Sequence, residues 1–112
     1  KGDMKARFES SYVYRSTDDG RTWQRLARFH AGKTQFNETA LLLTTGGRLL
    51  AALRTRSYEL WTSASEDDGV TWSEPKPLAP AWVHPADLLE VPQGVLLLAG
   101  NRVGPQHGVI GI

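Results

Sequence analysis

The sequence contains no cysteine, a single methionine and no long apolar run. Without cysteine, the chain can form neither disulfides nor thiolate metal sites. Its longest apolar runs are about five residues, far short of the roughly 20 that a membrane-spanning helix needs, so we expect no membrane segment. The sequence also has no large excess of charge of one sign, because it contains 13 basic and 12 acidic side chains for a net charge of +1. That balance argues against nucleic acid as a partner.

What the sequence does contain is an internal repeat in an otherwise ordinary globular composition of 40% hydrophobic and 22% charged residues. Residues 16–23 read Ser-Thr-Asp-Asp-Gly-Arg-Thr-Trp, and residues 65–72 read Ser-Glu-Asp-Asp-Gly-Val-Thr-Trp. A second pair of segments, Gly-Arg-Leu-Leu at 47–50 and Gly-Val-Leu-Leu at 94–97, has a similar separation. A period near 50 residues with strand-like segments predicts four-stranded blades of a β-propeller.

Strands are expected on both sides of each turn signal. The predicted strands are residues 11–16, 23–29, 39–44, 48–55, 58–63, 71–78, 87–91, 95–100 and 108–112. Residues 38–54 also have a helix-forming composition, but a Gly pair inside a helix would cost about 2 kcal/mol relative to Ala. We therefore predict an all-β chain. Residues 1–29 would supply the outer half of one blade, residues 37–80 a complete blade, and residues 84–112 the inner half of the next.

The repeated octapeptide can be explained by the physics of a turn. Its first Asp can accept backbone N–H bonds, its Gly can adopt a positive φ, its Ser can bond across the turn and its Trp can pack beneath it. The acidic residues could instead be a catalytic pair or calcium ligands. A cluster that recurs in each blade cannot be a unique site, so we favour the structural role and predict neither a metal nor a cofactor. The residues concerned are Ser16, Asp18, Gly20, Trp23, Ser65, Asp67, Gly69 and Trp72.

These octapeptides resemble the Asp-box (BNR) repeats of the sialidase superfamily, and the resemblance extends over essentially the whole chain. It implies a six-bladed β-propeller in which the Asp boxes join the third and fourth strands of blades. About two blades would lie in this sequence, which would then be a fragment of a longer protein. Asp boxes also occur in non-hydrolytic propellers, so they indicate a fold rather than a chemistry.

Hairpin register places charged residues at the end of the sheet away from the octapeptides. If Gly46-Gly47 is a two-residue turn, Glu38 faces Thr55 and lies beside Arg54. The same reasoning around Gln93-Gly94 places Pro85 opposite Arg102. Without the resemblance, an ion pair between Glu38 and Arg54 would be interpreted as a surface salt bridge that contributes about 0–1 kcal/mol to stability.

The resemblance gives these residues roles. Asn37-Glu38, a Gly turn and Arg54 follow the order of the sialidase pattern, although Thr39 stands where the family often has Pro. Glu38 would be the catalytic carboxylate that activates a tyrosine nucleophile. Arg54 and Arg102 would be substrate-binding residues, two of three arginines that bind the carboxylate of the sugar.

The resemblance therefore implies an exo-glycosidase that removes terminal sialic acid, or a related acidic sugar, from glycoconjugates with retention. The expected partner is a carbohydrate. A non-catalytic Asp-box propeller that binds glycans or proteins is the alternative, followed by a hydrolase or lyase with another substrate. The nucleophile, the acid/base and the first arginine of the family have no counterpart in this sequence, so we expect the chain alone to be inactive and either poorly folded or self-associated. The resemblance suggests a secreted or periplasmic protein.

Overall fold

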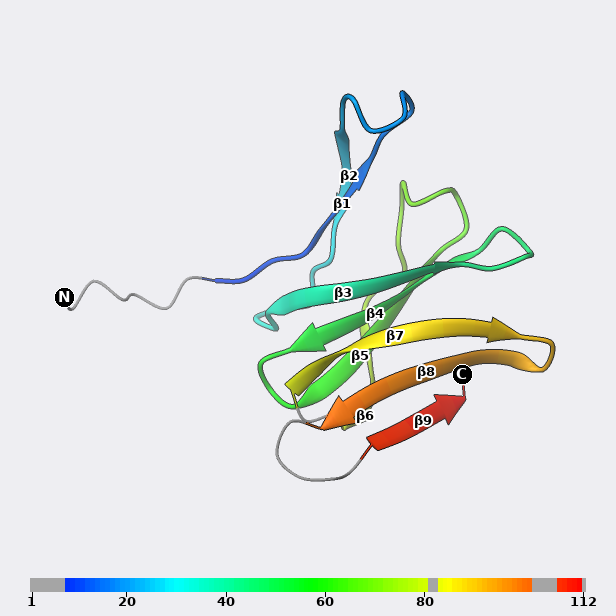
Figure 1. Cartoon of the computed structure of the whole chain (residues 1–112). Coiled ribbons are helices and arrows are strands. Elements are labelled where there is room, and N and C mark those ends of the chain that lie inside the picture. Colours follow the sequence, from blue (N-terminus) through cyan, green and yellow to red (C-terminus); the bar gives the residue numbers. More distant parts are fainter. Residues whose placement is uncertain (1–7, 81–82, 102–106, 112) are drawn as a thin grey trace, which may run out of the picture.

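The computed structural model describes residues 8–80, 83–101 and 107–111, which form nine strands in three antiparallel sheets (Figure 1). The strands are β1 (Tyr12–Arg15), β2 (Gln24–Arg28), β3 (Phe36–Leu43), β4 (Leu49–Thr55), β5 (Glu59–Ser65), β6 (Lys76–Pro80), β7 (Val83–Val91), β8 (Gly94–Asn101) and β9 (His107–Gly111). No helix occurs among the described residues. The all-β prediction is confirmed, and the helical alternative for residues 38–54 is wrong. Nothing in the described ranges is a helix that could span a membrane.

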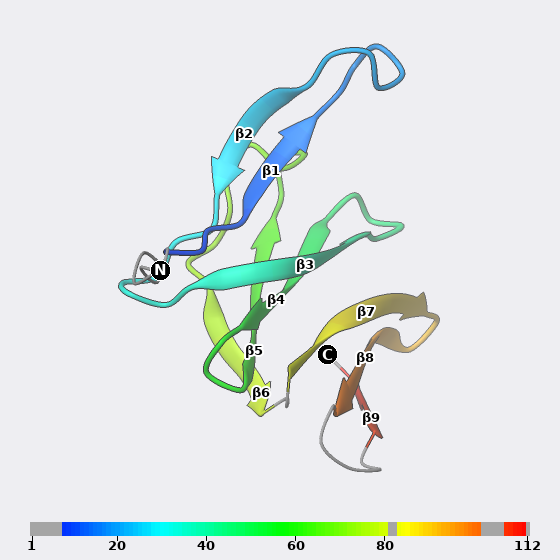
Figure 2. The ribbon, with the colours of Figure 1, turned by 60° about the vertical axis from the view of Figure 1, so that its left-hand side comes forward.

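The four-stranded sheet β3-β4-β5-β6 is the middle layer, with β1-β2 on one face and β7-β8-β9 on the other (Figures 1 and 2). Strand β4 explains this arrangement, because three consecutive residues in it, Ala51, Ala52 and Leu53, are at most 1% exposed. Successive side chains of a strand point to opposite faces. A continuous apolar run therefore belongs to a strand that is covered on both sides.

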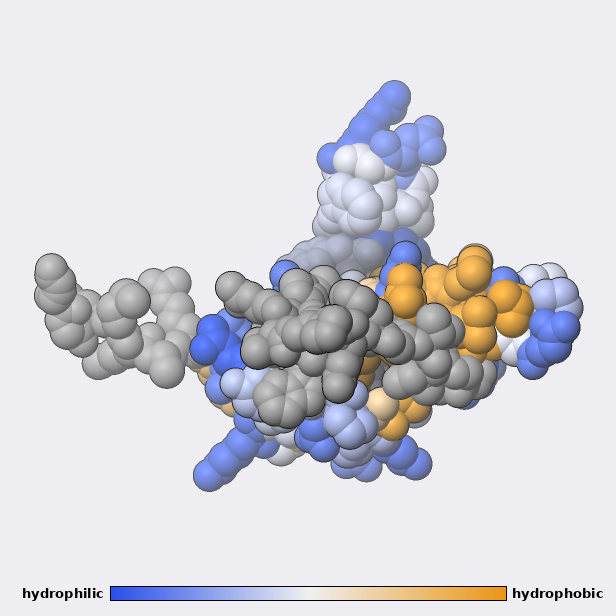
Figure 3. Space-filling model, turned by 60° about the horizontal axis from the view of Figure 1, so that its bottom comes forward, coloured by the Kyte–Doolittle hydropathy of each residue, from blue (hydrophilic) through white to orange (hydrophobic). Residues whose placement is uncertain are grey.

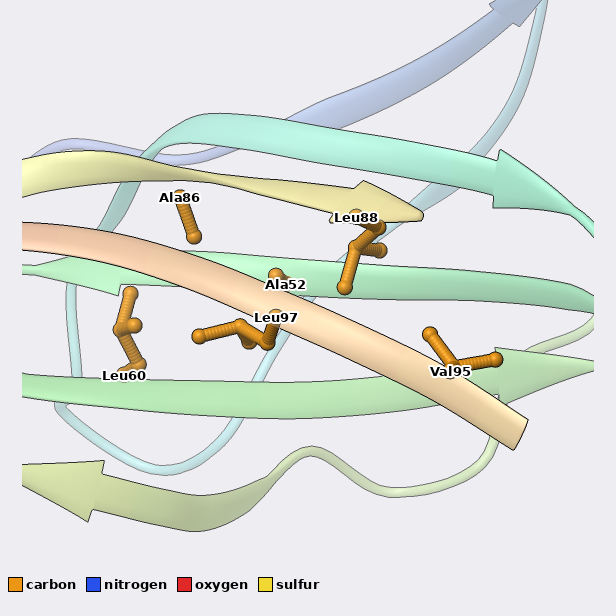
Figure 4. Packing of buried hydrophobic residues seen from close by; sticks show 6 residues of the cluster. All are labelled: Ala52, Leu60, Ala86, Leu88, Val95 and Leu97. Atoms are coloured by element: carbon orange, nitrogen blue, oxygen red, sulfur yellow. The ribbon is translucent and has the colours of Figure 1, made fainter. Parts of the chain in front are cut away.

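Two separate apolar clusters join the layers. Toward β1-β2, Ala51 and Leu53 pack with Val13, Phe29 and Phe36. Toward β7-β8, the cluster consists of Ala52, Leu60, Ala86, Leu88, Val95 and Leu97 (Figure 4). Both clusters involve contacts between segments far apart in sequence, which is how stacked repeats bury a core that no single sheet has alone.

The register of the β3–β4 hairpin differs from the prediction. Leu41 pairs with Ala51, so facing residue numbers add up to 92 rather than 93. The cause is the turn: the N–H of Gly47 bonds to the carbonyl of Thr44 at 2.9 Å, and Gly47 has a φ of 86°. This geometry is a three-residue loop that ends in a left-handed glycine. The predicted two-residue turn is wrong.

The β7–β8 hairpin also differs from the prediction. Val91 pairs with Gly94 and Asp87 with Leu98, so the two-residue loop lies at 92–93, one residue earlier than expected. At the far end of the hairpin Val83 pairs with Asn101. The predicted placement of Pro85 opposite Arg102 is therefore wrong, and Arg102 itself lies outside the described residues.

One predicted strand is largely absent. Residues 71–75 are not in a ladder, and β6 begins only at Lys76. The backbone N–H of Thr71 is bonded to the carboxylate of Asp67 at 2.8 Å, and Pro75 has no N–H to donate. The turn thus takes up the N–H of Thr71, and the paired part of the strand starts only at Lys76.

The octapeptide turns have the hydrogen bonds that the sequence predicts. In both copies the first Asp accepts the backbone N–H of the Thr four residues later at 2.8 Å, and the Ser hydroxyl accepts the N–H of the Gly. The Thr hydroxyl also donates to the Asp carboxylate and is the largest cause that lowers the pKa of Asp18 and of Asp67 to about 2. The Gly has a positive φ in each copy, and so does the Asp before it, at 60° and 59°.

The two octapeptide tryptophans differ in their packing. Trp72 is partly buried and lies edge-on to Phe29, with ring centroids 4.9 Å apart. Trp23 donates to the carbonyl of Gly20 at 3.1 Å but is 62% exposed. The expectation that each Trp packs beneath its turn is therefore confirmed for Trp72, whereas Trp23 has its hydrogen bond without the burial.

The chain reversals are distributed between two ends of the layers. The β1–β2, β3–β4 and β5–β6 connections lie toward one end, and the β4–β5 connection lies at the opposite end (Figure 2). Apolar side chains gather on the surface toward the β3–β4 and β7–β8 turns (Figure 3). Leu43, the last residue of β3, and Leu89 in β7 are both 60% exposed. The end with the β4–β5 connection is where the charged residues of the predicted site meet.

Candidate functional site

A β-bulge near the start of β3 positions the predicted carboxylate. Asn37 pairs with Arg54, whereas Thr39 pairs with Leu53, so Glu38 is an extra residue in β3 without a partner of its own. Bulges of this kind re-aim side chains and are found next to active sites. Here the bulge sets two consecutive residues, Asn37 and Glu38, against the single residue Arg54.

Glu38 and Arg54 form an ion pair at this bulge, between Oε2 of the carboxylate and one terminal nitrogen of the guanidinium. The side chain of Arg54 is 23% exposed and that of Glu38 is 52% exposed. The carboxylate is thus more exposed to solvent than the guanidinium is. We call this end of the sheet, at the start of β3 and the end of β4, the rim. The structure brings together the two residues that the sequence placed side by side.

A second carboxylate, Glu9, joins this rim from the segment before β1. It accepts a hydrogen bond from the terminal nitrogen of Arg56 at 2.7 Å and another from the side-chain amide of Asn37 at 2.8 Å. The bond from Arg56 is the main cause that lowers the pKa of the Glu9 carboxyl, and the same bond raises the pKa of Arg56. This end of the sheet therefore has two ion pairs, Glu9 with Arg56 and Glu38 with Arg54.

Two polar atoms at the centre of the rim are buried without a hydrogen-bond partner among the described residues, namely Oδ1 of Asn37 and Nε of Arg54. One is an acceptor and the other a donor. The amide orientation of Asn37 is fixed by Glu9, because only its –NH2 group can donate to a carboxylate. Buried polar groups are nearly always satisfied. The oxygen of Asn37 therefore suits a donor and the Nε–H of Arg54 suits an acceptor, and ordered water can serve as either.

The two ends of β4 carry arginines in different settings. Arg48, at the end near the octapeptides, is paired with Glu66 at 2.8 Å, and both side chains are more than half exposed. Arg54, at the rim, is held by the bulge and faces a group of polar residues from three segments of the chain. A solvated surface ion pair contributes little to stability. Arg54, in contrast to Arg48, has a guanidinium that is mostly buried and surrounded by polar residues.

The next repeat has the same bulge with other residues. In the β7–β8 hairpin, Val83 pairs with Asn101 and Ala86 with Ala99, so His84 and Pro85 together oppose a single residue. The positions that correspond to Glu38 and Arg54, 47 residues further along, are Pro85 and Asn101. The β-bulge is repeated in the next hairpin, but the pair of oppositely charged residues is not.

In β7, the carboxylate of Asp87 accepts a hydrogen bond from the backbone N–H of Leu88 at 2.9 Å and so has a local role. The described residues contain no group of three His, Asp or Glu side chains that could hold a metal ion. Sequence reasoning missed Glu9. Only contacts between positions 28 and 47 residues apart connect it to the rim, and no local pattern signals them.

The Glu38–Arg54 pair supplies a carboxylate and a guanidinium within reach of solvent, next to the more exposed guanidinium of Arg56. Arginine binds a carboxylate through two parallel N–H···O bonds, so an anionic ligand could replace Glu38 on Arg54 or use the other edge of the guanidinium. Glu38, displaced or not, would remain beside the ligand as a hydrogen-bond acceptor. This is chemistry for recognising an anion that also carries hydroxyl groups.

Comparison with known proteins supports the repeat assignment. A sequence model of the BNR repeat-like domain family matches residues 3–108. A crystal structure of a protein of unknown function from Dyadobacter fermentans DSM 18053 is similar, with a TM-score of 0.72 and 29% sequence identity. The alignment covers 89% of this chain and 28% of that one, so this chain spans less than a third of its length. No curated protein matches. Because the family match extends over most of the sequence, the chain belongs to the BNR repeat-like domain family, which confirms its resemblance to the Asp-box repeats of the sialidase superfamily.

Proposed function

We propose that this chain is part of a sialidase-like exo-glycosidase that binds and hydrolyses a terminal acidic sugar at the rim formed by Glu38 and Arg54. The observation that carries the proposal is the Glu38–Arg54 ion pair at a bulge, opposite the octapeptide end of the sheet. Arg102 would be a second carboxylate-binding arginine, although it lies outside the described residues. The partner would be a sialylated or otherwise acidic glycan.

In this proposal Arg54 binds the carboxylate of the sugar and Glu38 acts on a tyrosine nucleophile. An anionic nucleophile would be repelled by an anionic sugar, so a neutral tyrosine polarised by a carboxylate is the better choice, as in sialidases. Glu38 has the exposure that this role needs, at 52% of its side chain. The unpaired Oδ1 of Asn37 and Nε of Arg54 would meet hydroxyl groups or ordered water at the base of the site.

The blade assignment is part of the same proposal. Residues 1–29, 37–80 and 84–112 would belong to three successive blades of a six-bladed propeller, with the rim facing its central funnel. Sheets of two, four and three strands packed face to face support that assignment. Further blades would cover the exposed leucines of the outer layers.

The test compares Arg54 in β4 with Arg48, the residue directly before β4, in the full-length protein. Arg54→Ala should weaken binding of sialyllactose roughly 10- to 100-fold, because hydrogen bonds to a charged group are worth about 1.5–3 kcal/mol. Arg48→Ala is the matched control and should leave binding unchanged, since its partner is the surface residue Glu66. Equal affinity of wild type and Arg54→Ala for sialyllactose would refute the assignment of Arg54.

A second candidate is a binding module without catalysis. It is favoured by one contact: an oxygen of the Glu38 carboxylate, the group that would have to act on the nucleophile, is already bonded to Arg54. Hydrolysis of a fluorogenic α-sialoside by the full-length protein separates the two candidates. Turnover that is lost in Glu38→Gln supports the glycosidase. Binding of sialyllactose without turnover supports the binding module.

A further inference from the structure

Two faces of the layered structure carry exposed leucines. One face belongs to β3, where Leu41 and Leu43 are 51% and 60% exposed. The other belongs to β7 and β8, where Leu89 and Leu98 are 60% and 53% exposed. Leu98 lies on the same face as Leu89, because it pairs with Asp87, two residues before Leu89 in β7. Each face thus has two large apolar side chains that no neighbouring layer covers.

The repeat shows what covers such leucines elsewhere in the chain. Strand β7 repeats β3 at an offset of 47 residues, with the same bulge near its start. Leu41 of β3 therefore corresponds to Leu88 of β7, which packs against the middle sheet and is only 8% exposed (Figure 4). In the other direction, Leu89 of β7 corresponds to Leu42 of β3, which packs against the same cluster. Leu41 and Leu89 thus occupy positions that are covered in the other repeat.

The strands of the outer layers show why the face of β3 is open. Leu41 pairs with Ala51, a residue of the cluster toward β1-β2, so its side chain points to that layer. Strands β1 and β2 are joined by an octapeptide and therefore correspond to β5 and β6, and among the described residues their sheet has no counterpart of β3 and β4. The third layer begins with those counterparts, β7 and β8. It has the two strands that the first layer lacks.

We infer that this chain associates head to tail with a second copy of itself, so that the β7–β8 hairpin of the copy covers the open face of β3. Leu89 and Leu98 of the copy then pack on Leu41 and Leu43, as the middle sheet and the third layer already pack within one chain. Because β1 and β9 both correspond to β5, β1 takes the place of β9 beside the copy's β8. The inference concerns the faces of the sheets and does not rest on the proposed function.

A polar contact between the layers supports this pairing by its counterpart. Glu90 of β7 accepts the backbone N–H and the hydroxyl of Thr45, both at 2.9 Å, and so ties the third layer to the β3–β4 loop. At the same offset of 47 residues, Glu90 corresponds to Leu43 and Thr45 corresponds to the exposed Pro92. In the contact between copies, an apolar pair therefore stands where the carboxylate and its donors would be, and no carboxylate loses its partner at this point.

The experiment is sedimentation velocity of the 112-residue chain over a range of concentrations. Wild type should form dimers and larger species, because a head-to-tail contact leaves one open face at each end. Leu43→Asp and Leu89→Asp each place a charge in one of the two faces and should raise the dissociation constant about 100-fold or more. An equimolar mixture of these two variants should form a 1:1 dimer and nothing larger, because each variant retains the face that the other lacks. Val70→Asp is the matched control, at an octapeptide residue that is 47% exposed, and should associate like wild type.

Circular dichroism of each variant should match that of wild type, because both leucines are exposed in the single chain. Leu43→Lys and Leu89→Lys form a second pair, so that the result does not depend on one introduced side chain. A wild-type chain that stays monomeric or is unfolded would overturn the inference, and so would association that survives in both single variants. Monomeric variants that do not pair when mixed would show that a face meets its own copy, which also overturns it. None of these outcomes changes the test of Arg54 by sugar binding.

Discussion

Replacing Trp72 by alanine tests whether the second octapeptide joins two layers of the structure. The indole of Trp72 lies edge-on to Phe29 at 4.9 Å, in the apolar cluster between β1-β2 and the middle sheet. Its Nε1–H donates to the carbonyl of Gly69 at 2.9 Å. The side chain therefore connects its own turn to the preceding repeat, and its removal should weaken both.

The magnitude follows from area. A buried indole covers roughly 150–250 Å², which at about 25 cal/mol per Å² corresponds to roughly 4–6 kcal/mol. Trp72 is only partly buried, so we expect a loss of about 3–4 kcal/mol, near the lower end of the range for Trp→Ala substitutions. Of this, the edge-on contact with Phe29 should account for about 0.5–1.5 kcal/mol.

The assay is urea unfolding of the full-length protein with a double-mutant cycle between Trp72→Ala and Phe29→Leu. The coupling energy of the cycle isolates the aromatic contact. Val70→Ala is the control, since Val70 belongs to the same turn and is 47% exposed, and it should change stability by no more than about 0.5 kcal/mol. A loss below about 1 kcal/mol for Trp72→Ala would show that the octapeptide does not join the layers.

Two further predictions concern the turns. The pKa of Asp18 and Asp67 is lowered from 3.8 to about 2 by hydrogen bonds that the folded state provides. The stability that these groups contribute is present above the unfolded pKa and is lost as the pH falls from about 4 toward 2. In an acid titration of the double variant Asp18→Asn/Asp67→Asn, the free energy of unfolding should therefore decline less steeply in that window than in wild type. In the β3–β4 loop, Gly47 has a φ of 86° and Gly46 does not have a positive φ. Gly47→Ala should therefore lower the free energy of unfolding in urea by about 1–2 kcal/mol. Gly46→Ala should be neutral or slightly stabilising, because its added Cβ would meet no atom within 4 Å. Equal effects of the two substitutions would contradict the turn geometry.

The features that the sequence predicts well are local ones. The bonds of the octapeptide connect residues two to four positions apart, so the order of Ser, Asp, Gly and Thr determines the turn without help from the rest of the chain. The buried character of β4 is equally readable, because an unbroken apolar run needs cover on both faces. Strand pairing around the glycine turns follows from the same local signals.

Register is less readable, because one residue more or less in a loop shifts every pair. The β3–β4 hairpin differs from the prediction by one residue at Gly47 and by another at the bulge beside Asn37. A left-handed glycine makes the three-residue loop possible, but the sequence Gly-Gly fits a two-residue turn as well. Even so, Glu38 and Arg54 meet, because both shifts are small compared with the reach of their side chains.

The long-range part of the rim could not be predicted. Glu9 bonds to Asn37 and Arg56 across separations of 28 and 47 residues, and its contribution depends on how the segment before β1 crosses the middle sheet. The left-handed conformation of Tyr58 is similarly hidden. Its φ of 61° occurs in the β4–β5 connection, where the hydroxyl of Thr55 donates to the carbonyl of Glu59 and accepts from the N–H of Ser57.

The octapeptide carboxylates Asp18 and Asp67 differ from Glu38, and the difference bears on the proposed function. Asp18 and Asp67 have both oxygens occupied by Ser and Thr groups of their own turn, and their pKa is lowered to about 2. Such a group is a weak base, and every donor around it is already used, so it holds a loop together. Glu38 instead bonds to one guanidinium and leaves 52% of its side chain in solvent. Because chemistry needs an acceptor with free capacity, our proposal places the substrate at Glu38 and gives the octapeptide carboxylates a structural role.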